Sequence, residues 1–322
     1  MAALVHLSFR DFLLDNEMSR ELPLEVEELT MHRADPNKAS ANPLIPDRDT
    51  AAMVTSSTAT QSLASSAPRN NAPIVDDNPA LLSYYNSFES RIGWGVVTNG
   101  TRHAGYWEHD TKWPFPLSAA FRRMEARLFT TLALPPGSRV LDAGCGDSQV
   151  AIHLASKGLF VTGIDVVPRH LENSWRNIRK SGLPAGMVEV QYADYHHLEH
   201  VPSESFDGVY TVETLLHATD PAAVLAGFYR VLKPGGRLVL HEGEHPDTGA
   251  ADLEKQRAET NEHAAMPTCQ ASTTGFYLRL VEDAGFAAVG QEDLTAKVRP
   301  LARLFYCIAL VPYYLIVLLL LE

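Results

Sequence analysis

The run VLDAGCGDS, residues 140–148, constrains the fold of this chain more than any other segment. It places Asp142 two positions before a Gly-x-Gly turn, after a short apolar stretch and ahead of a helix-like segment. Gly144 and Gly146 allow positive φ and let a ligand approach the backbone, while the following helix offers free N–H groups. This pattern indicates a strand, a ligand-binding turn and a helix in an α/β fold.

The segments around this run alternate between strand-like and helix-like patterns, which is typical of an α/β domain with a mainly parallel sheet. Strands are expected at 139–143, 159–164, 187–192, 206–212, 237–241 and 287–290, and helices at 149–157, 168–180, 222–232 and 273–284. Right-handed crossovers make this a doubly wound, Rossmann-like sheet with a ligand crevice at the carboxyl ends of the strands.

The N-terminal quarter has a different composition. Residues 1–78 hold 12 acidic and 6 basic residues and a long run of Ala, Ser, Thr, Asn and Pro, which predicts a mostly disordered acidic leader. Residues 4–18 could form a short amphipathic helix, but they lack the features of a signal peptide. Residues 79–135 predict a helical, aromatic-rich lid, and residues 136–296 predict the α/β domain.

The C-terminal segment, residues 297–322, predicts a hydrophobic helix. Residues 304–321 form 18 consecutive uncharged residues, about 27 Å of helix, which is close to the thickness of a hydrocarbon core. Basic residues precede this run, as expected for the cytoplasmic side of a membrane anchor. A core or lid helix and an interfacial helix remain open alternatives. The chain ends one residue after the run, so a shortened chain is a further alternative.

Charge and cysteine content exclude several classes of protein. The chain carries 27 basic and 39 acidic residues, a net charge of -12, so no nucleic-acid partner is expected. The three cysteines form no CxxC pair, which argues against a disulfide framework or a zinc site and favours a reducing, cytoplasmic compartment. The cluster HEGEH at 241–245 lacks the spacing of a helical HExxH site, and we expect no metal.

Two cofactor classes fit the glycine turn. A dinucleotide fingerprint expects a third glycine at position 149, which is Gln149, whereas Asp165 at the end of the second strand suits the ribose of either a dinucleotide or S-adenosylmethionine. Three later motifs separate the two readings: YAD at 192–194, FDGVYTVETLLHA at 206–218 and LKPGG at 232–236. With these motifs in this order, residues 84–295 resemble class I S-adenosylmethionine-dependent methyltransferases, and within them the sterol C-methyltransferase and tocopherol methyltransferase branch.

The resemblance implies a set of cofactor-binding residues. Asp142, Gly144, Cys145 and Gly146 would surround the methionine part of S-adenosylmethionine. Asp165, with Val166 beside it, would bind the ribose hydroxyls, and Asp194 and Tyr195 would contact the adenine. Ser148 departs from the pattern, because many members have glycine there.

The resemblance also implies an acceptor side. Glu213 and His217 match an E-to-H segment of the sterol enzymes and would face the same way on a helix, where they could orient the acceptor or take its proton. A cofactor-binding or merely packed role is the alternative. Tyr85 belongs to an aromatic stretch that resembles the YYN, GWG and HxGYW segments of these families and could shelter a flat apolar substrate: Tyr84, Tyr85, Trp94, Tyr106 and Trp107.

The sequence therefore predicts methyl transfer from S-adenosylmethionine to carbon, oxygen or nitrogen of a lipophilic small molecule, an isoprenoid, sterol-like or polyketide secondary metabolite. The first alternative is a catalytically silent, methyltransferase-like regulator or membrane-tethered scaffold. The second is an NAD-dependent dehydrogenase, against which the missing third glycine and the later motifs argue. The sequence assigns no oligomeric state.

Overall fold

The computed structural model describes residues 25–35, 77–246, 249 and 251–320. The expected helix at 4–18 and most of the expected leader lie outside these residues. The described residues form a seven-stranded sheet in the order β4-β3-β2-β5-β6-β1-β7. Its strands are β1 (Glu25–Arg33), β2 (Arg139–Ala143), β3 (Phe160–Asp165), β4 (Val188–Tyr192), β5 (Phe206–Val212), β6 (Leu232–Glu244) and β7 (Phe286–Asp293).

The centre of the sheet is parallel and covered on both faces. β2 pairs in parallel with β3 and with β5, and its residues Val140 and Leu141 are both almost fully buried although they point to opposite faces. A strand buried on both faces reads as a continuous apolar run, which is why VLDA is a strong strand signal. The doubly wound sheet expected from the sequence is therefore present.

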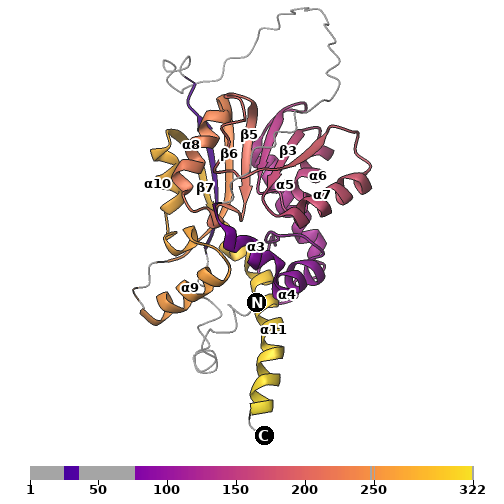
Figure 1. Ribbon diagram of the computed structural model, residues 1–322, viewed down its shortest axis with the longest axis vertical. Coiled ribbons are helices and arrows are strands. Elements are labelled where there is room, and N and C mark those ends of the chain that lie inside the picture. Colours follow the sequence, from indigo (N-terminus) through magenta and orange to yellow (C-terminus); the bar gives the residue numbers. More distant parts are fainter. Residues whose placement is uncertain (1–24, 36–76, 247–248, 250, 321–322) are drawn as a thin grey trace, which may run out of the picture.

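Helices cover the two faces of this sheet (Figure 1). α5 (Leu117–Leu132), α6 (Gln149–Ser156) and α7 (Pro168–Ser181) lie on one side, and α8 (Pro221–Val231) and α10 (Phe276–Asp283) lie on the other. Local chemistry sets their ends: proline opens α7 and α8, Asp220 accepts a 2.9 Å hydrogen bond from the N–H of Ala223, and α7 ends at Gly182 with a φ of 72°.

Strand β1 departs from the expectation for residues 1–78, to which the sequence analysis assigned no strand. It lies between β6 and β7 and runs antiparallel to both. Glu28, at the middle of β1, is buried and accepts hydrogen bonds from His241 at 2.6 Å and from Arg127 at 2.7 Å. These long-range partners allow a glutamate to occupy an interior strand, and no local sequence pattern reveals them.

Two strands extend beyond their expected limits. β6 begins at Leu232, pairs there with Phe206, and then shifts register so that Gly208 pairs with Arg237. The KPGG segment is thus absorbed as an irregularity of one long strand, with Gly235 at a φ of 75°, and does not precede the strand as a separate turn. β7 likewise covers more residues than the expected 287–290.

The remaining helices lie at the carboxyl end of the parallel strands or beyond it (Figure 1). They are α3 (Pro79–Asn86), α4 (Phe88–Ile92), the π-helix η1 (Gly93–Val97), the short helices η2 (Leu215–His217) and η3 (Thr268–Gln270), α9 (Ala251–His263) and α11 (Thr295–Leu320). The first turns of α11 pack through Leu301 against Trp107 and Phe121, and the helix then extends away from the body. Within the described ranges, no helix has the length and apolarity needed to cross a membrane.

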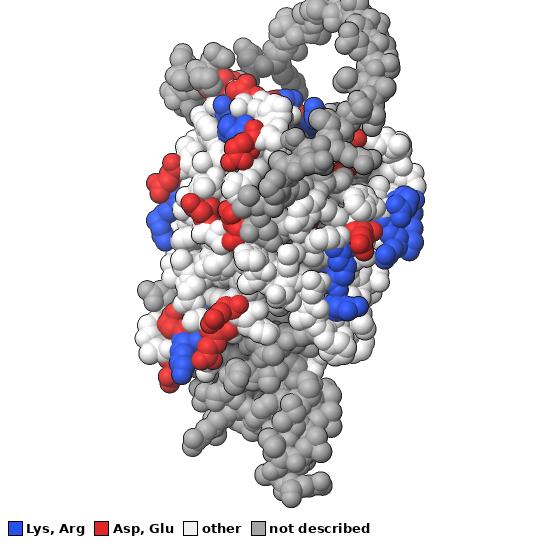
Figure 2. Space-filling model, in the orientation of Figure 1, with Lys and Arg blue, Asp and Glu red and all other residues white. Residues whose placement is uncertain are grey.

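Charged side chains are scattered on the face shown in Figure 2. Basic residues form small groups that are separated by acidic and uncharged residues. The described part of this face therefore carries no continuous basic surface.

Candidate active site

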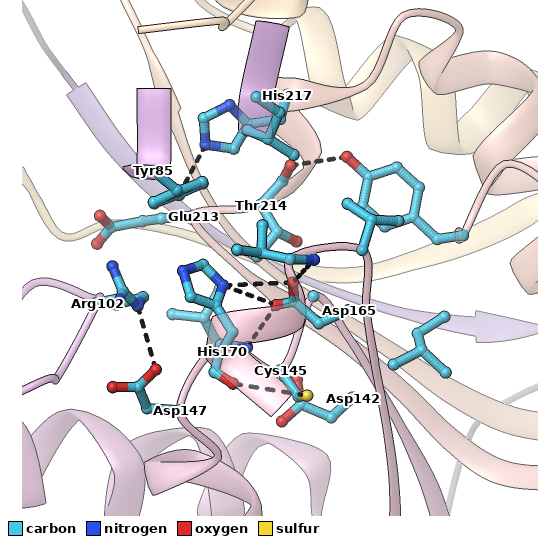
Figure 3. A pocket seen from close by; sticks show the side chains of 18 of the residues that line it. Tyr85, Arg102, Asp142, Cys145, Asp147, Asp165, His170, Glu213, Thr214 and His217 are labelled. Carbon is cyan, nitrogen blue, oxygen red and sulfur yellow. Dashed lines mark hydrogen bonds and ion pairs between the residues drawn. The ribbon is translucent and has the colours of Figure 1, made fainter. Parts of the chain in front are cut away.

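A pocket opens where β2, β3 and β5 end (Figure 3). It holds about 900 Å³ of empty space when its open mouth is counted. All eleven residues that the sequence analysis selected line it: Tyr85, Asp142, Gly144, Cys145, Gly146, Asp165, Val166, Asp194, Tyr195, Glu213 and His217.

The glycine turn forms the floor of this pocket. The N–H groups of Gly144 and Cys145 both donate to the carbonyl of Ile164 at 2.9 Å, which joins the ends of β2 and β3. Gly144 has a φ of 96°, and a Cβ there would lie 2.6 Å from the methyl of Thr214. Ser148, where many family members have glycine, adopts a φ of 60° and donates its hydroxyl to Ser174 at 2.9 Å.

Asp142 and Asp165 lie side by side with different protonation behaviour. Burial raises the pKa of Asp142 to about 7, and the neighbouring charge of Asp165 adds to the effect. Tyr210, which pairs with Asp142 across β2 and β5, opposes this rise in pKa through its hydroxyl group. Burial also acts to raise the pKa of Asp165, but His170 and the N–H groups of Gly146 and Val167, each 2.8 Å from the carboxylate, lower it overall. Asp165 therefore stays ionised, whereas Asp142 takes up a proton more readily.

Asp194 and Tyr195 also line the pocket. Asp194 accepts hydrogen bonds from His196 Nδ1 at 2.6 Å and from the N–H of Asp77 at 3.1 Å, and Tyr195 donates its hydroxyl to the carbonyl of Thr214 at 3.0 Å. The ligand atoms of Asp77, Asp194 and His196 lie within 4.8 Å of one another. Since these hydrogen bonds account for that arrangement, we assign no metal to it.

Cys145 lies in the floor as a packed thiol. Burial raises its pKa well above the ordinary value, and its side chain fills the space beside Gly163. It therefore stays protonated and has no nucleophilic character.

The turn after β5 differs from the helix that the spacing of Glu213 and His217 suggested. Glu213 takes a left-handed φ of 54°, and only Leu215–His217 forms a short helical turn. Glu242 holds this conformation, because its Oε1 accepts from the N–H groups of Thr214 at 3.2 Å and Leu215 at 3.1 Å. Both expected residues still reach the pocket, although not by sharing a helix face.

Glu213 presents a buried carboxyl group to the pocket. Its Oε1 accepts a 2.7 Å hydrogen bond from the N–H of Ala104. Burial raises its pKa, although that hydrogen bond and the charge of His103 act in the opposite direction.

Tyr85 and His217 form a hydrogen-bonded pair in the pocket wall (Figure 3). His217 Nδ1 lies 2.8 Å from the carbonyl of Ala265, which can only accept, so Nδ1 carries the proton and Nε2 accepts from the Tyr85 hydroxyl at 3.1 Å. Burial lowers the pKa of His217 to about 4 and raises that of Tyr85 far above its ordinary value. Both groups are therefore neutral near pH 7.

Most of the other expected aromatic residues lie elsewhere. Trp94 packs edge-on against Phe305 of α11, Trp107 is buried with its indole N–H donating to the carbonyl of Pro114, and Tyr106 lies beneath the guanidinium of Arg127. Tyr84 contacts the ring of Tyr85 from outside the pocket lining. The aromatic stretch thus packs mainly against α5 and α11 and not around the pocket.

The HEGEH cluster is used for structure. Its four polar residues pair separately: His241 with Glu28, Glu242 with the turn after β5, Glu244 with the N–H groups of Gly275 and Tyr277, and His245 with Arg257.

Arg102 also lines the pocket and was not selected from the sequence. Its Nε lies 3.6 Å from Asp147 Oδ1, and its guanidinium lies 5.3 Å from the centre of the Tyr85 ring. Arg102 occurs in a loop without periodicity, and only the HxGYW segment that begins one residue later pointed to its neighbourhood.

Comparison with known proteins identifies the family. Residues 141–240 match the family model described as "Methyltransferase domain". The chain is 43% identical over 248 residues to the S-adenosyl-L-methionine-dependent Diels-Alderase iccD of Talaromyces variabilis, covering 76% of this chain and 85% of that protein. This chain belongs to the class I S-adenosylmethionine-dependent methyltransferase family. The sterol and tocopherol branch receives no support from these matches.

Two further proteins resemble the chain. It is 44% identical over 223 residues to the S-adenosyl-L-methionine-dependent Diels-Alderase iliD of Neonectria sp. (strain DH2), covering 68% of this chain and 86% of that protein. The crystal structure of the [4+2]-cyclase SpnF superposes with a TM-score of 0.59 at 25% identity, covering 71% of this chain and 79% of that one.

The pocket fits S-adenosylmethionine, the cofactor of this family. Asp142 lines the pocket beside the glycine turn, where its carboxyl group suits the methionine ammonium, and the ionised Asp165 suits the ribose hydroxyls. The missing Cβ atoms at Gly144 and Gly146 let Thr214 and Arg102 pack against the glycine turn that forms the pocket floor. The cofactor predicted from the sequence is therefore confirmed.

Proposed function

We propose that this protein is an S-adenosylmethionine-dependent cyclase that accelerates an intramolecular [4+2] cycloaddition of a linear, lipophilic polyene of secondary metabolism. The observation that carries the proposal is the similarity to the Diels-Alderase iccD, which extends over 85% of that protein's length. The likeness to the [4+2]-cyclase SpnF supports the same reaction type. Methyl transfer is not part of this reaction.

The reaction itself makes modest chemical demands. Four π electrons of a diene and two of an alkene form two C–C σ bonds and one new π bond, and no atom enters or leaves. The product is an isomer of the substrate. No acid, base or leaving group is needed, so catalysis depends on holding the two reacting ends together and on fixed charges near the alkene.

The Tyr85–His217 pair is suited to such a role. Both ring nitrogens of His217 are engaged, one with the Ala265 carbonyl and one with the Tyr85 hydroxyl, so the imidazole offers no free site for a proton. The pair thus forms a rigid polar section of a wall that also contains apolar residues such as Leu81 and Val150. When bound, the cofactor supplies a fixed positive charge beside this wall.

A second candidate is methylation at carbon, oxygen or nitrogen of a similar lipophilic molecule. The observation that favours it is the buried carboxyl of Glu213, which lines the pocket and could accept the proton that an acceptor loses. In that case the methyl group would form a bond to the acceptor, S-adenosylhomocysteine would leave, and the proton would pass to Glu213.

Product analysis separates the two candidates. The full chain is incubated with linear substrates that carry a conjugated diene and an α,β-unsaturated carbonyl, with and without S-adenosylmethionine. We expect a cyclic isomer of unchanged mass that forms faster with protein and cofactor than with either alone. A product heavier by one CH₂ would overturn the cyclase proposal and establish methylation.

A further inference from the structure

Large apolar side chains are exposed together in the helices and loops that precede the sheet. Of the six exposed large hydrophobic side chains in the described residues, four lie between residues 88 and 115: Phe88, Val96, Trp113 and Phe115. Phe88, Val96 and Trp113 are 78%, 76% and 72% exposed. Exposed apolar side chains that gather in one region mark an interaction site, whereas scattered ones are ordinary. We call these four residues the apolar collar.

The segments that carry the apolar collar pack against the first half of α11. Within η1, Trp94 contacts the ring of Phe305 edge-on, with the ring centres 5.8 Å apart. The loop that leads to Trp113 is held by Arg303, whose Nη2 donates to Asp110 Oδ2 at 2.9 Å. The apolar collar therefore lies at the end of the molecule from which α11 projects (Figure 1).

The projecting part of α11 has no polar face. Residues 304–320 contain no charged, amide, serine or threonine side chain, and their only polar groups are tyrosine hydroxyls and one thiol. A helix that pairs with another helix in water keeps a polar outer face, whereas a helix that is apolar on all sides is surrounded by apolar material. At 1.5 Å per residue this stretch is about 25 Å long, less than the ~30 Å of a hydrocarbon core. It therefore suits a helix end that enters lipid from one side without crossing it.

The charge of this end of the molecule is opposite to that of the whole chain. α11 carries three basic side chains, Lys297, Arg299 and Arg303, and no acidic one, whereas the chain has a net charge of -12. Residues 88–116, which hold the apolar collar, add three basic and three acidic residues and so no net charge. Basic residues beside an apolar helix end are attracted to anionic lipid head groups.

We propose that the end of α11 and the apolar collar dock the protein onto the surface of an anionic lipid bilayer. The end of α11 is embedded from one side, and Trp113 and Phe115 lie at the level of the head groups, where aromatic side chains are favoured. This proposal concerns the attachment of the protein and does not rest on the cyclase proposal, so either one can fail without the other.

Vesicle flotation with a matched pair of tryptophan variants tests the proposal. The full chain is mixed with vesicles of phosphatidylcholine, alone or with phosphatidylserine, and we expect it to float with both and to bind the anionic vesicles more tightly. Trp113→Glu should weaken binding about 10- to 100-fold, because it removes a large apolar group from the apolar collar. Trp175→Glu makes the same change at a 46% exposed tryptophan of α7 and should leave binding unchanged.

Cys307 allows α11 itself to be followed. It is exposed, whereas Cys145 and Cys269 are buried, so a thiol-reactive, environment-sensitive fluorophore labels α11 selectively. We expect its emission to shift to the blue when anionic vesicles are added, and Leu315→Glu should weaken vesicle binding at least about tenfold.

Three results would overturn the proposal. They are no flotation with either kind of vesicle, equal losses for Trp113→Glu and Trp175→Glu, and an unchanged emission at Cys307 in the presence of anionic vesicles. Self-association in analytical ultracentrifugation without any binding to vesicles would likewise overturn it and identify a second copy of this chain as the partner of α11. Near-ultraviolet circular dichroism establishes that each variant is folded.

Discussion

Tyr85 of α3 donates its hydroxyl to Nε2 of His217, 132 residues later in the chain, at 3.1 Å. This hydrogen bond joins α3 to the turn after β5. It also fixes the proton of the imidazole on Nδ1, toward the Ala265 carbonyl. The pair therefore closes one side of the cofactor pocket without leaving a free base there.

The first prediction concerns the protonation of His217. Its pKa is lowered to about 4 by burial, so the ring should remain neutral, with its proton on Nδ1, at every pH above about 5. ¹⁵N NMR of selectively labelled histidines checks both the tautomer and the titration midpoint. A midpoint at or above the ordinary histidine value would show that the ring is solvated and would contradict the described wall.

The second prediction concerns Glu242, which holds the turn after β5. Burial raises its pKa to about 7 from 4.5, so the folded state binds this proton more tightly than the unfolded state. The contribution of this group favours folding below pH 4.5 and is lost as the pH rises through 7. Glu242→Gln removes this dependence and should gain stability relative to the wild type between pH 5 and 8, on the order of 3 kcal/mol.

Glu242→Ala provides the contrast to the glutamine variant. It removes the acceptor of two buried N–H groups, those of Thr214 and Leu215. This variant should be less stable than the wild type by about 2–4 kcal/mol at pH 5 and at pH 8. Urea denaturation at pH 5 and pH 8 measures both variants. Equal pH dependence in the wild type and in Glu242→Gln would rule out the raised pKa.

The third prediction isolates the close contact between the glycine turn and Thr214. Gly144→Ala and Gly137→Ala both place a side chain at a φ near 90°, which costs about 1–2 kcal/mol. At Gly137 nothing lies within 4 Å of the added Cβ, whereas at Gly144 the Thr214 methyl lies at 2.6 Å. Only Gly144→Ala should lose cofactor affinity in calorimetry. Unchanged cofactor affinity in Gly144→Ala would refute the tight approach.

The fourth prediction concerns the anchoring of β1. Burial acts to raise the pKa of Glu28, but the hydrogen bonds and charges of His241 and Arg127 lower it overall. Its contribution to stability is present above pH 4.5 and is lost as the pH falls below that value. Glu28→Ala leaves the buried His241 without its partner and Arg127 with only the exposed Glu292, and should cost about 3–5 kcal/mol at pH 7 in urea denaturation.

Glu292→Ala is the matched control for β1. Both Glu28 and Glu292 lie 2.7 Å from Arg127 Nη2, but the Glu292 side chain is 52% exposed. Exposed pairs contribute at most about 1 kcal/mol, so this variant should unfold nearly as the wild type does. Equal losses for the two variants would show that burial of Glu28 is not what anchors the strand.

The central sheet and the cofactor pocket were predictable because their signals are local. VLDA is apolar enough to be a strand buried on both faces, and Gly144 and Gly146 follow it directly. Asp165 and Asp194 each follow a strand pattern, and parallel strands bring their carboxyl ends together at one edge of the sheet. The identity of the cofactor was predicted from the motifs shared with the family.

Strand β1 and Arg102 escaped prediction because their partners are distant. β1 contains two consecutive glutamates, and Glu28 is compatible with burial only through Arg127 and His241. Arg102 sits in a loop, where no period distinguishes a buried arginine from a solvated one. The spacing of Glu213 and His217 is compatible with a helix, but the left-handed backbone at Glu213 depends on Glu242, 29 residues further on, and no local pattern reveals it.

The fate of the cofactor's methyl group tests the cyclase proposal most directly. The protein is incubated with a linear polyene that it converts and with S-adenosylmethionine labelled in the methyl group, and the product and S-adenosylhomocysteine are quantified together. The expected result is a cyclised product without label and no S-adenosylhomocysteine above the control without substrate. One labelled methyl group and one S-adenosylhomocysteine per product would contradict the proposal and identify a methyltransferase.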